Sequence, residues 1–173
     1  MAVGWRPAPT GWITVNSDGS LLRPSGSTVA GGALRDWQGR LLGAYTTNQG
    51  RCSITRAEIC GALKGLELAW EACHRQVELQ LDSKTALALL LDTGRHNHQH
   101  ANLAIRFQNM LRREWSVWVT HIYREANFLT DCLAHKGHTL CPGTNLIDVT
   151  DSDVCRWALF DSVGGFTIRL IAE

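Results

Sequence analysis

The sequence predicts an α/β fold in which helices pack against a mixed β-sheet. Three strands open the chain, and strands then alternate with helices in the order β-β-β-α-β-α-α-β-α. Strands joined by short turns pair antiparallel, whereas strands that return after a helix pair in parallel. At 173 residues the chain has the length of one domain.

The first three strands are indicated by alternation and by turn residues. In WITVNSD, residues 12–18, Ile13 and Val15 share one face and the polar side chains share the other, as in a half-buried strand. Residues 24–47 hold two further apolar stretches separated by DWQG at 36–39. A turn at DWQG predicts a β-hairpin.

The middle of the chain predicts two helices around a fourth strand. Apolar residues at helical spacing indicate a helix from Thr55, and VELQLD at 77–82 alternates like a strand. Ser83 then suits the N-cap of a second helix, which we expect to stop at Gly94.

The last part of the body adds a helix over 101–114, a strand over 115–122 and a short helix capped by Asn127. Beyond it, DVCRWALFD favours a helix and GFTIRLI favours a strand. We therefore expect a lead-in at 1–10, a domain over 11–138, and an extension over 139–173 that packs on the same domain.

The composition excludes several classes of protein. No apolar run reaches the roughly 18 to 20 residues of a membrane helix, and MAVGWRPAPT lacks the pattern of a secretory signal. The six cysteines form no C-x-x-C pair, which favours buried free thiols over a disulfide framework. We expect an intracellular monomer, in the nucleus or cytoplasm, that binds no membrane.

The charge is uneven along the chain. Residues 1–140 carry 15 Lys and Arg against 11 Asp and Glu, whereas residues 141–173 carry 2 against 5. A modestly basic body permits a polyanionic partner, but the absence of a strongly basic run argues against very tight nonspecific binding of nucleic acid.

Four acidic residues occupy suggestive places. Asp18 and Asp82 each end a strand on its polar face, Glu58 lies in the first turn of a helix, and Asp131 lies between leucines in another. Taken singly, the first three are ordinary turn or helix-start residues, and Asp131 is the hardest to explain. Ligands of open α/β sheets gather at the carboxyl ends of strands, where we expect the four to meet.

Four carboxylates could share one site only with cations, because their mutual repulsion would raise the pKa of some of them. Two divalent ions about 4 Å apart remove that repulsion and suit phosphodiester hydrolysis: one activates a water and the other stabilises the leaving oxygen. Oxygen ligands favour Mg²⁺, with Mn²⁺ as a substitute, over zinc.

With these motifs in view, the chain resembles the ribonuclease H family. VNSDGS, TRAEICGAL, LQLDSKTAL and HIYREANFLTDCLA match its four acidic motifs in order. The lead-in W-x-P-x-P-x-G-W and the segment GGALRDWQGRLLGAY are similar to plant ribonuclease-H-like domains, including those of LINE-type retroelement reverse transcriptases. The resemblance covers residues 5–138 and implies a mixed five-stranded sheet in the order 3-2-1-4-5, flanked by helices.

The resemblance also implies an activity: endonucleolytic hydrolysis of the RNA strand of RNA/DNA hybrids, with a reverse transcriptase domain of the same polyprotein as a further partner. Asp18 would bridge both metals, Glu58 and Asp82 would complete the shell, and Asp131 would hold the metal that activates water. His121 corresponds to the mobile-loop histidine that some members use for proton transfer or product release.

Substrate contacts are less complete. The family reads 2′-hydroxyls partly through backbone groups after the first aspartate, here Gly19 and Ser20. Many members carry two asparagines before the motif Arg-x-Glu and a glutamine after the third acid, whereas here those places hold Ile54, Thr55 and Lys84. The resemblance leaves Thr55 and Lys84 as candidate contacts and implies low hybrid affinity.

Two other functions stay open. Arg124 is a candidate phosphate contact, but the missing asparagines and the low net charge favour a catalytically weak or inactive module that binds nucleic acid or protein. A 3′–5′ exonuclease would need Asp-x-Glu at the first motif, where this chain has Asp18-Gly19-Ser20.

Weaker signals come from histidines and tryptophans. HNHQH at 96–100 indicates a solvated loop. His135, His138 and Cys141 could supply three ligands of a zinc site, but the sequence shows no evident fourth ligand. We expect most of the seven tryptophans to pack inward.

Overall fold

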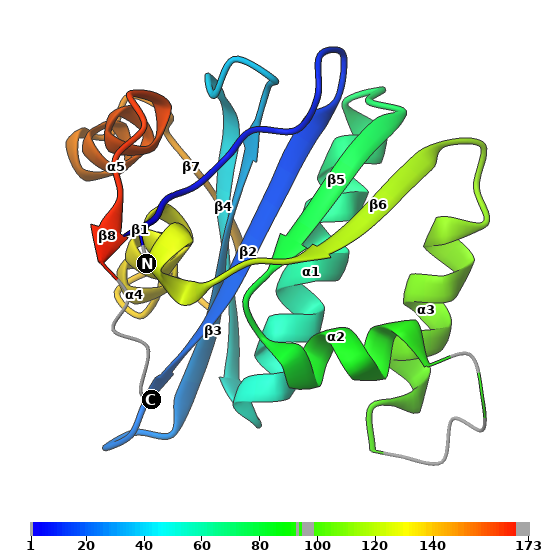
Figure 1. The fold of residues 1–173 in the computed structure, drawn as a ribbon. Coiled ribbons are helices and arrows are strands. Elements are labelled where there is room, and N and C mark those ends of the chain that lie inside the picture. Colours follow the sequence, from blue (N-terminus) through cyan, green and yellow to red (C-terminus); the bar gives the residue numbers. More distant parts are fainter. Residues whose placement is uncertain (1, 93, 95–98, 169–173) are drawn as a thin grey trace, which may run out of the picture.

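The computed structural model describes residues 2–92, 94 and 99–168, and its centre is one twisted sheet (Figure 1). Its strands are β2 (Ile13–Leu22), β3 (Ser27–Arg35), β4 (Leu41–Arg51), β5 (Gln76–Leu81), β6 (Ser116–His121) and β7 (Gly143–Ile147). They lie in the order β6-β5-β2-β3-β4-β7. β2 pairs antiparallel with β3 and parallel with β5, so the sheet is mixed.

The predicted strand order is confirmed, and the predicted strand number is wrong by one. Strands β4-β3-β2-β5-β6 reproduce the order 3-2-1-4-5, and β7 adds a sixth strand antiparallel to β4. A separate two-stranded sheet joins β1 (Ala2–Val3) to β8 (Thr167–Ile168). β1 and β7 escaped prediction because strands of two to five residues are too short to show a periodic pattern, whereas β8 lies within the strand expected at GFTIRLI.

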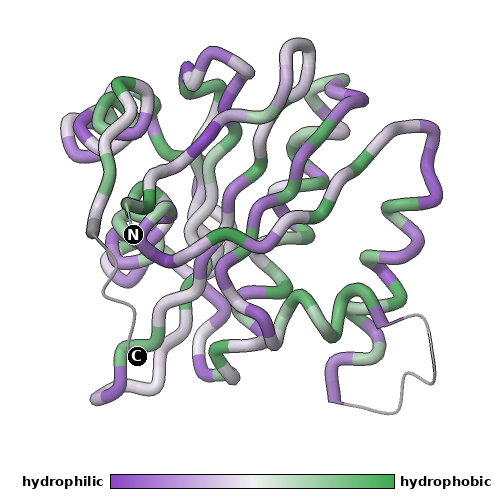
Figure 2. Tube along the Cα trace, viewed as in Figure 1, coloured by the Kyte–Doolittle hydropathy of each residue, from purple (hydrophilic) through white to green (hydrophobic). Residues whose placement is uncertain are grey.

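Three helices cover one face of the sheet: α1 (Ile54–Glu71), α2 (Lys84–Leu91) and α3 (Ala101–Leu111). α1 begins at Ile54, one residue before the predicted start, and the hydroxyl of its N-cap Ser53 accepts a hydrogen bond from the Arg56 amide. Val15, Leu79, Leu66 and Phe107 are fully buried between these helices and the sheet. Val77, Leu79 and Leu81 of β5 are buried on this face, and Figure 2 shows hydrophobic and hydrophilic residues alternating along that strand.

The opposite face is covered over β3 and β4 by α4 (Phe128–Gly137) and α5 (Ser152–Ser162), with a 3₁₀ turn η1 (Arg124–Ala126) before α4. Gly31 allows this packing, because a β-carbon there would collide with the backbone of Ala134 and Thr130 in α4. Leu129 and Leu133 of α4 are thereby buried against Ala33 of β3. The close approach of α4 to the sheet brings Asp131 within reach of β2.

The lead-in and α5 meet at a buried arginine on β3. Arg35 is fully buried, bonds to Asp161 of α5 at 2.5 Å and to Asn16 Oδ1 at 2.6 Å, and lies 3.4 Å from the ring centroid of Trp5. Burial lowers the pKa of Arg35 to about 10, and Asp161 opposes that shift. Segments from both ends of the described chain thus share one buried polar group.

The two predicted N-caps are in place: Ser83 caps α2 by accepting from the Ala86 amide at 3.2 Å, and Asn127 is the N-cap residue of α4, although its side chain makes no capping bond. Other local predictions were wrong. The described chain ends α2 at Leu91, before Gly94. The six cysteines are free but none is buried. Residues 95–98 of the predicted histidine loop lie outside the described residues.

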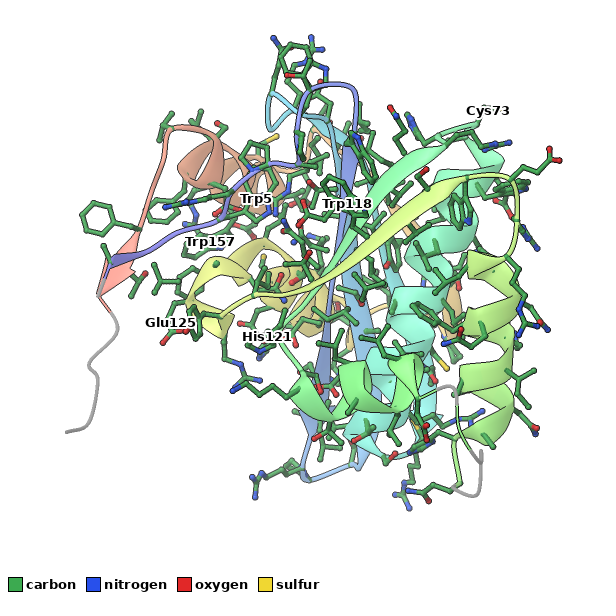
Figure 3. The ribbon with its side chains drawn as sticks, turned by 45° about the vertical axis from the view of Figure 1, so that its right-hand side comes forward. Trp5, Cys73, Trp118, His121, Glu125 and Trp157 are labelled. Carbon is green, nitrogen blue, oxygen red and sulfur yellow. The ribbon has the colours of Figure 1, made fainter. Side chains whose placement is uncertain are left out.

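The tryptophans also pack less deeply than predicted. Trp5 is buried, but Trp37 and Trp118 are exposed. Trp118 stands on β6, on the sheet face away from α1, and its ring stacks 4.0 Å from that of Trp12 (Figure 3). Aromatic residues at the open edge of a sheet shield each other in this way when no helix covers them.

Candidate active site

Asp18 is a buried carboxylate on the central strand β2. It is 1% exposed; its Oδ1 accepts a hydrogen bond from the Gly19 amide at 2.7 Å, and its Oδ2 has no hydrogen-bond partner within the described part of the chain. Burial, followed by the nearby charge of Asp82 and a smaller effect of Asp131, raises the pKa of Asp18 to about 8. An unpartnered buried oxygen of this kind calls for a proton or a cation.

Glu58 lies against the strand that carries Asp18 because Gly19, the next residue of that strand, has no side chain. A β-carbon on Gly19 would lie 2.8 Å from Glu58 Cγ and 3.0 Å from Ile54 Cδ1, so the first turns of α1 rest directly on β2. Burial and the charge of Asp82 raise the pKa of Glu58, and a hydrogen bond with the Ser83 side chain opposes the shift. Gly19 therefore allows the helix that carries Glu58 to pack directly on β2.

Asp82 follows β5 beside these groups. Its side chain is 6% exposed and lies 3.6 Å from Arg124 Nε, which contributes the cationic edge of the site. Burial raises the pKa of Asp82, and Arg124 opposes that shift. Nε2 of His121 lies 3.2 Å from the Asp82 backbone oxygen, so this histidine also borders the site.

Asp131 completes the set from α4. Its side chain is 45% exposed, and its Oδ1 lies 3.4 Å from His135 Nδ1. The peptide N–H of Asp131 donates to the backbone oxygen of Asn127 at 3.1 Å. Asp131 is thus the solvent-facing member of the four acids, and its charge is felt at buried Asp18.

Asn127 is a residue whose importance the sequence reading missed. It is 1% exposed, and its side-chain amide crosses from α4 to donate to the Ser17 carbonyl of β2 at 3.2 Å. An asparagine before a helix looks like an N-cap, so its long-range bond was hidden. Its place between Arg124 and Asp131 in R-E-x-N-x-x-x-D was the available signal.

The donor set fits a hard divalent cation. Asp18, Glu58, Asp82 and Asp131 offer only carboxylate oxygens, the ligands that Mg²⁺ and Mn²⁺ prefer, and one oxygen of Asp18 is buried without a partner. Within the described residues, no three His, Cys, Asp or Glu side chains are already close enough to form a metal-binding group. Among the described residues the acids are therefore near enough to shift one another's pKa, as Asp82 and Asp131 do for Asp18 and Asp82 does for Glu58, but they do not form a closed set of ligands.

The predicted substrate contacts are spread around this centre. Ser20 is half-buried and lies 3.1 Å from His138 Nε2, whereas Lys84 is exposed at the start of α2. Thr55 is half-buried in the first turn of α1. His135 and His138 contact Asp131 and Ser20 respectively, so the two histidines point at different groups and do not converge.

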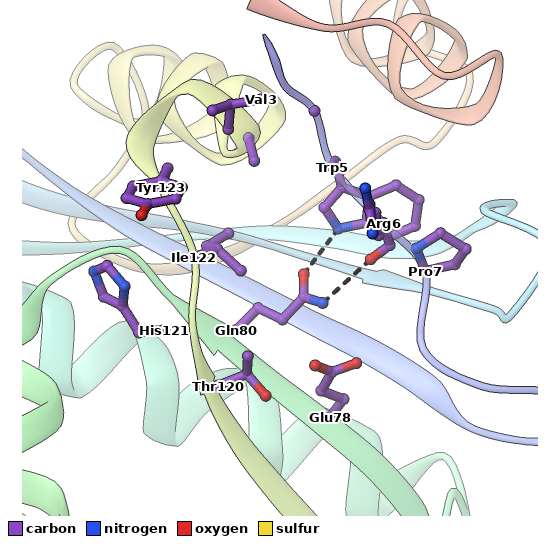
Figure 4. A pocket seen from close by; sticks show the side chains of 12 residues that line it. Val3, Trp5, Arg6, Pro7, Glu78, Gln80, Thr120, His121, Ile122 and Tyr123 are labelled. Carbon is purple, nitrogen blue, oxygen red and sulfur yellow. Dashed lines mark hydrogen bonds between the residues drawn. The ribbon is translucent and has the colours of Figure 1, made fainter. Parts of the chain in front are cut away.

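A cavity of about 300 Å³ lies next to the acids, between the lead-in, β5, β6 and η1 (Figure 4). Gln80 closes its floor: its Oε1 accepts from Trp5 Nε1 at 2.9 Å and its Nε2 donates to the Arg6 carbonyl at 3.2 Å. The cavity shares His121 with the acidic site. The lead-in, held by these two hydrogen bonds, thus forms one wall of the cavity beside the site.

Solved structures of low sequence identity share this fold. The ribonuclease H1 of the halophilic archaeon Halobacterium salinarum matches with a TM-score of 0.66 and 22% identity over 73% of this chain and 97% of that one. LC11-RNase H1 in complex with an RNA/DNA hybrid matches with a TM-score of 0.63 and 18% identity over 72% and 94%. The foamy viral protease-reverse transcriptase in complex with an RNA/DNA hybrid matches with a TM-score of 0.61 and 15% identity over 73% of this chain and 20% of that one.

Sequence comparison defines the family. A protein of Arabidopsis thaliana named "Putative ribonuclease H protein" is 35% identical over 169 residues, which is 98% of this chain and 27% of the relative. The chain thus spans about a quarter of the length of that relative. The reverse transcriptase-like family matches residues 16–137, which include all four acids. The chain belongs to this reverse transcriptase-like family, and its fold is that of ribonuclease H.

Proposed function

We propose that this chain is a metal-dependent endonuclease that hydrolyses the RNA strand of RNA/DNA hybrids. The observation that carries the proposal is the buried Asp18 carboxylate, which has one unpartnered oxygen and a pKa raised by burial and by the neighbouring acids. A carboxylate in that setting is strongly stabilised by a bound cation. Ribonuclease H fold and family membership supply the reaction class.

Asp18, Glu58, Asp82 and Asp131 would hold two Mg²⁺ ions, or Mn²⁺ in their place. When bound, such ions supply an activated water and charge stabilisation for phosphodiester cleavage. Gly19 lets the first turns of α1, which carry Glu58, rest on β2 next to Asp18, and Arg124, exposed beside Asp82, is free at its outer edge to bind a substrate phosphate.

His121 is suited to carry a proton at the edge of the site. Its Nε2 faces the carbonyl oxygen of Asp82, which can only accept a hydrogen bond, so Nε2 holds the proton of the neutral ring. Nδ1 is then the basic nitrogen, available to take a proton from water or to return it to the leaving oxygen.

The similar structures also suggest the partners of this chain. An RNA/DNA hybrid is present in two of the similar structures, and one of these is a reverse transcriptase. We infer that a reverse transcriptase domain in the same polyprotein supplies the hybrid, and that the domain acts as an intracellular monomer. None of the helices in the described part of the chain is long and apolar enough to span a bilayer.

A second function has one observation in its favour. Ile54 stands where many family members carry an asparagine, and its side chain packs toward Gly19 instead of offering a polar contact. A hybrid held without that contact would be cut slowly, and the fold would then serve as a binding module for nucleic acid or protein.

Cleavage of labelled substrates separates the two functions. Purified protein with Mg²⁺ or Mn²⁺ should cut the RNA strand of a hybrid and leave duplex DNA intact, and Asp82→Asn should abolish cutting while the circular dichroism spectrum is unchanged. Asp92→Asn, an exposed aspartate after α2, is the matched control. Absence of metal-dependent cutting at micromolar protein would establish the binding module instead.

A further inference from the structure

The sheet face away from α1 carries an unpaired carboxylate on β5. Val77 and Leu79 are buried on the side of α1, so Glu78 between them points to the other face. Helix α4 packs over β2, β3 and β4, which leaves the face over β5 to the lead-in. Glu78 is half-buried and forms no hydrogen bond or ion pair within the described residues. A carboxylate partly withdrawn from water in this way is stabilised by a cation.

Glu78 borders the cavity of Figure 4 on one side. The lining of that cavity also includes Thr120 of β6, whose hydroxyl makes no hydrogen bond among the residues that the structure describes. Pro7 and Ile122 contribute apolar walls. The cavity therefore offers acceptor oxygens from two strands beside apolar surface, which suits the end of a long cationic side chain.

On its other side Glu78 adjoins an exposed aromatic ring. Trp118 of β6 is the register partner of Glu78, and it stays 51% exposed although Trp12 stacks on it (Figure 3). Neighbouring strands are about 4.8 Å apart, so one planar cation can lie against the indole and still reach the carboxylate. A guanidinium group stacks on tryptophan and donates parallel hydrogen bonds to a carboxylate, whereas an ammonium group makes a single point contact.

The other charged or titratable groups of the lining leave this position open. The Arg6 side chain is exposed and forms no ion pair with Glu78, and Nε2 of His121 faces the Asp82 carbonyl. Phosphate groups are repelled by the carboxylate of Glu78, so a nucleic-acid strand is a poor occupant of this face.

We propose that Glu78 and Trp118, with the adjoining cavity, form a docking site for an arginine side chain presented by a partner protein. The guanidinium pairs with Glu78 and lies against Trp118, and the partner segment continues into the cavity beside Thr120. The inference does not depend on the proposed nuclease function. Because His121 also lines the cavity, a bound partner would border the acidic site from the side of β6.

The probes are a capped tripeptide with one arginine between two alanines and its counterparts with lysine and with citrulline, the uncharged analogue of arginine. Binding is followed in NMR titrations through two indole N–H signals. The signal of Trp118, assigned with Trp118→Phe, reports on this face. The signal of Trp5, whose Nε1 bonds to Gln80 in the cavity, reports when Trp118 is replaced.

Wild type should bind the arginine peptide about tenfold or more tightly than the citrulline peptide, the effect of hydrogen bonds to a charged group, with the lysine peptide between them. Glu78→Gln should bind all three alike. Trp118→Ala should weaken the arginine peptide about two- to fivefold. Glu71→Gln, at an exposed glutamate on the end of α1, should match wild type, and Arg6→Ala should bind at least as tightly as wild type.

Equal binding of the arginine and citrulline peptides by wild type would overturn the proposal, and so would a preference for arginine that persists in Glu78→Gln. The preference should also weaken as salt is added to wild type; a preference independent of salt counts against the ion pair without the use of a variant. A single-stranded RNA that shifts the Trp118 signal equally in wild type and in Glu78→Gln, with no effect of the arginine peptide, would assign this face to nucleic acid instead.

Discussion

The side-chain amide of Asn127 donates a hydrogen bond to the Ser17 carbonyl oxygen across 3.2 Å, joining the start of the helix that carries Asp131 to the strand that carries Asp18. The same Asn127 accepts the Asp131 peptide N–H through its backbone oxygen at 3.1 Å. One buried residue thus links two carboxylates that are far apart in sequence. Fixed separation of metal ligands is a requirement of such sites.

Asn127→Ala should therefore impair catalysis more than stability. Loss of the amide leaves the Ser17 carbonyl without this donor, which costs about 1–3 kcal/mol in the free energy of unfolding, and loosens Asp131 relative to Asp18. We expect kcat to fall by about tenfold or more at temperatures where the variant is fully folded. Urea unfolding and hybrid cleavage measure the two effects.

Asn102→Ala is the matched control, because Asn102 is exposed on α3, away from the four acids. It should retain both stability and activity. A fully folded Asn127→Ala with wild-type kcat would show that Asp131 needs no such support.

Gly19→Ala should damage the site from the opposite side. The new methyl group would lie 2.8 Å from Glu58 Cγ, so Glu58 must move away from β2. Activity at saturating hybrid should fall, and more Mg²⁺ should be needed for half-maximal rate, because one ligand of the site is displaced. Titration of the cleavage rate with Mg²⁺ measures this.

Gly43→Ala provides the comparison for that variant. A β-carbon at Gly43 of β4 meets no atom within 4 Å, so the same substitution adds no contact there. Equal Mg²⁺ dependence of the two variants would mean that Gly19 does not seat Glu58.

The central fold was predictable because its signals are local and periodic. Alternation located β2, which carries Asp18, and β5, which Asp82 follows, and helical spacing located α1 with Glu58, since each pattern repeats over several turns or pleats. The strand order was predicted from the family resemblance, which the four acidic motifs carry and which is visible in the sequence itself. The short strands β1 and β7 carry no such repeat.

The unpredicted contacts are those between residues distant in sequence. Asn127 bonds to Ser17, 110 residues away, and Arg35 bonds to Asp161, 126 residues away. Nothing in the sequence near Arg35 distinguishes it from a surface arginine, because its burial depends on α5 and the lead-in closing over it. Partners fixed only by tertiary packing leave no periodic signal.

Asp161→Asn tests the buried pair that holds α5 on the sheet. Arg35 is fully buried, so removing its counter-ion leaves an uncompensated charge, a change that costs about 3–5 kcal/mol in proteins. We expect the free energy of unfolding to fall by about that amount in urea. Replacing both partners by apolar residues, Arg35→Met with Asp161→Leu, should recover much of it.

Asp153→Asn on the exposed side of α5 is the control, because its contact with Arg156 is a solvent-exposed pair at 3.7 Å. Such pairs contribute little, so its unfolding curve should overlay that of wild type. Equal curves for Asp161→Asn and wild type would show that α5 does not supply the counter-ion of Arg35 in solution.

The raised pKa of Asp18 predicts a pH dependence of stability with a definite sign. In the metal-free protein this pKa is about 8, above the unfolded value of 3.8, so between these limits the folded state holds a proton that the unfolded state has released. The free energy of unfolding should therefore fall as pH rises from about 4 to 8, by up to about 1.4 kcal/mol per pH unit. Asp18→Asn removes this contribution.

The free energy of unfolding of wild type and of Asp18→Asn is measured in urea from pH 5 to 8 with a chelator present. As pH rises, the stability of wild type should fall steadily relative to that of the variant. Mg²⁺ should reverse the trend in wild type above neutral pH, because the cation takes the place of the proton on the carboxylate. Asp148→Asn is the control, since hydrogen bonds from Thr150 lower the pKa of Asp148; this carboxyl is therefore ionised in both the folded and the unfolded state from pH 5 to 8, and its replacement should add no pH dependence. Parallel pH curves for wild type and Asp18→Asn, unaffected by Mg²⁺, would mean that Asp18 is an ordinary ionised aspartate and that the site holds no cation.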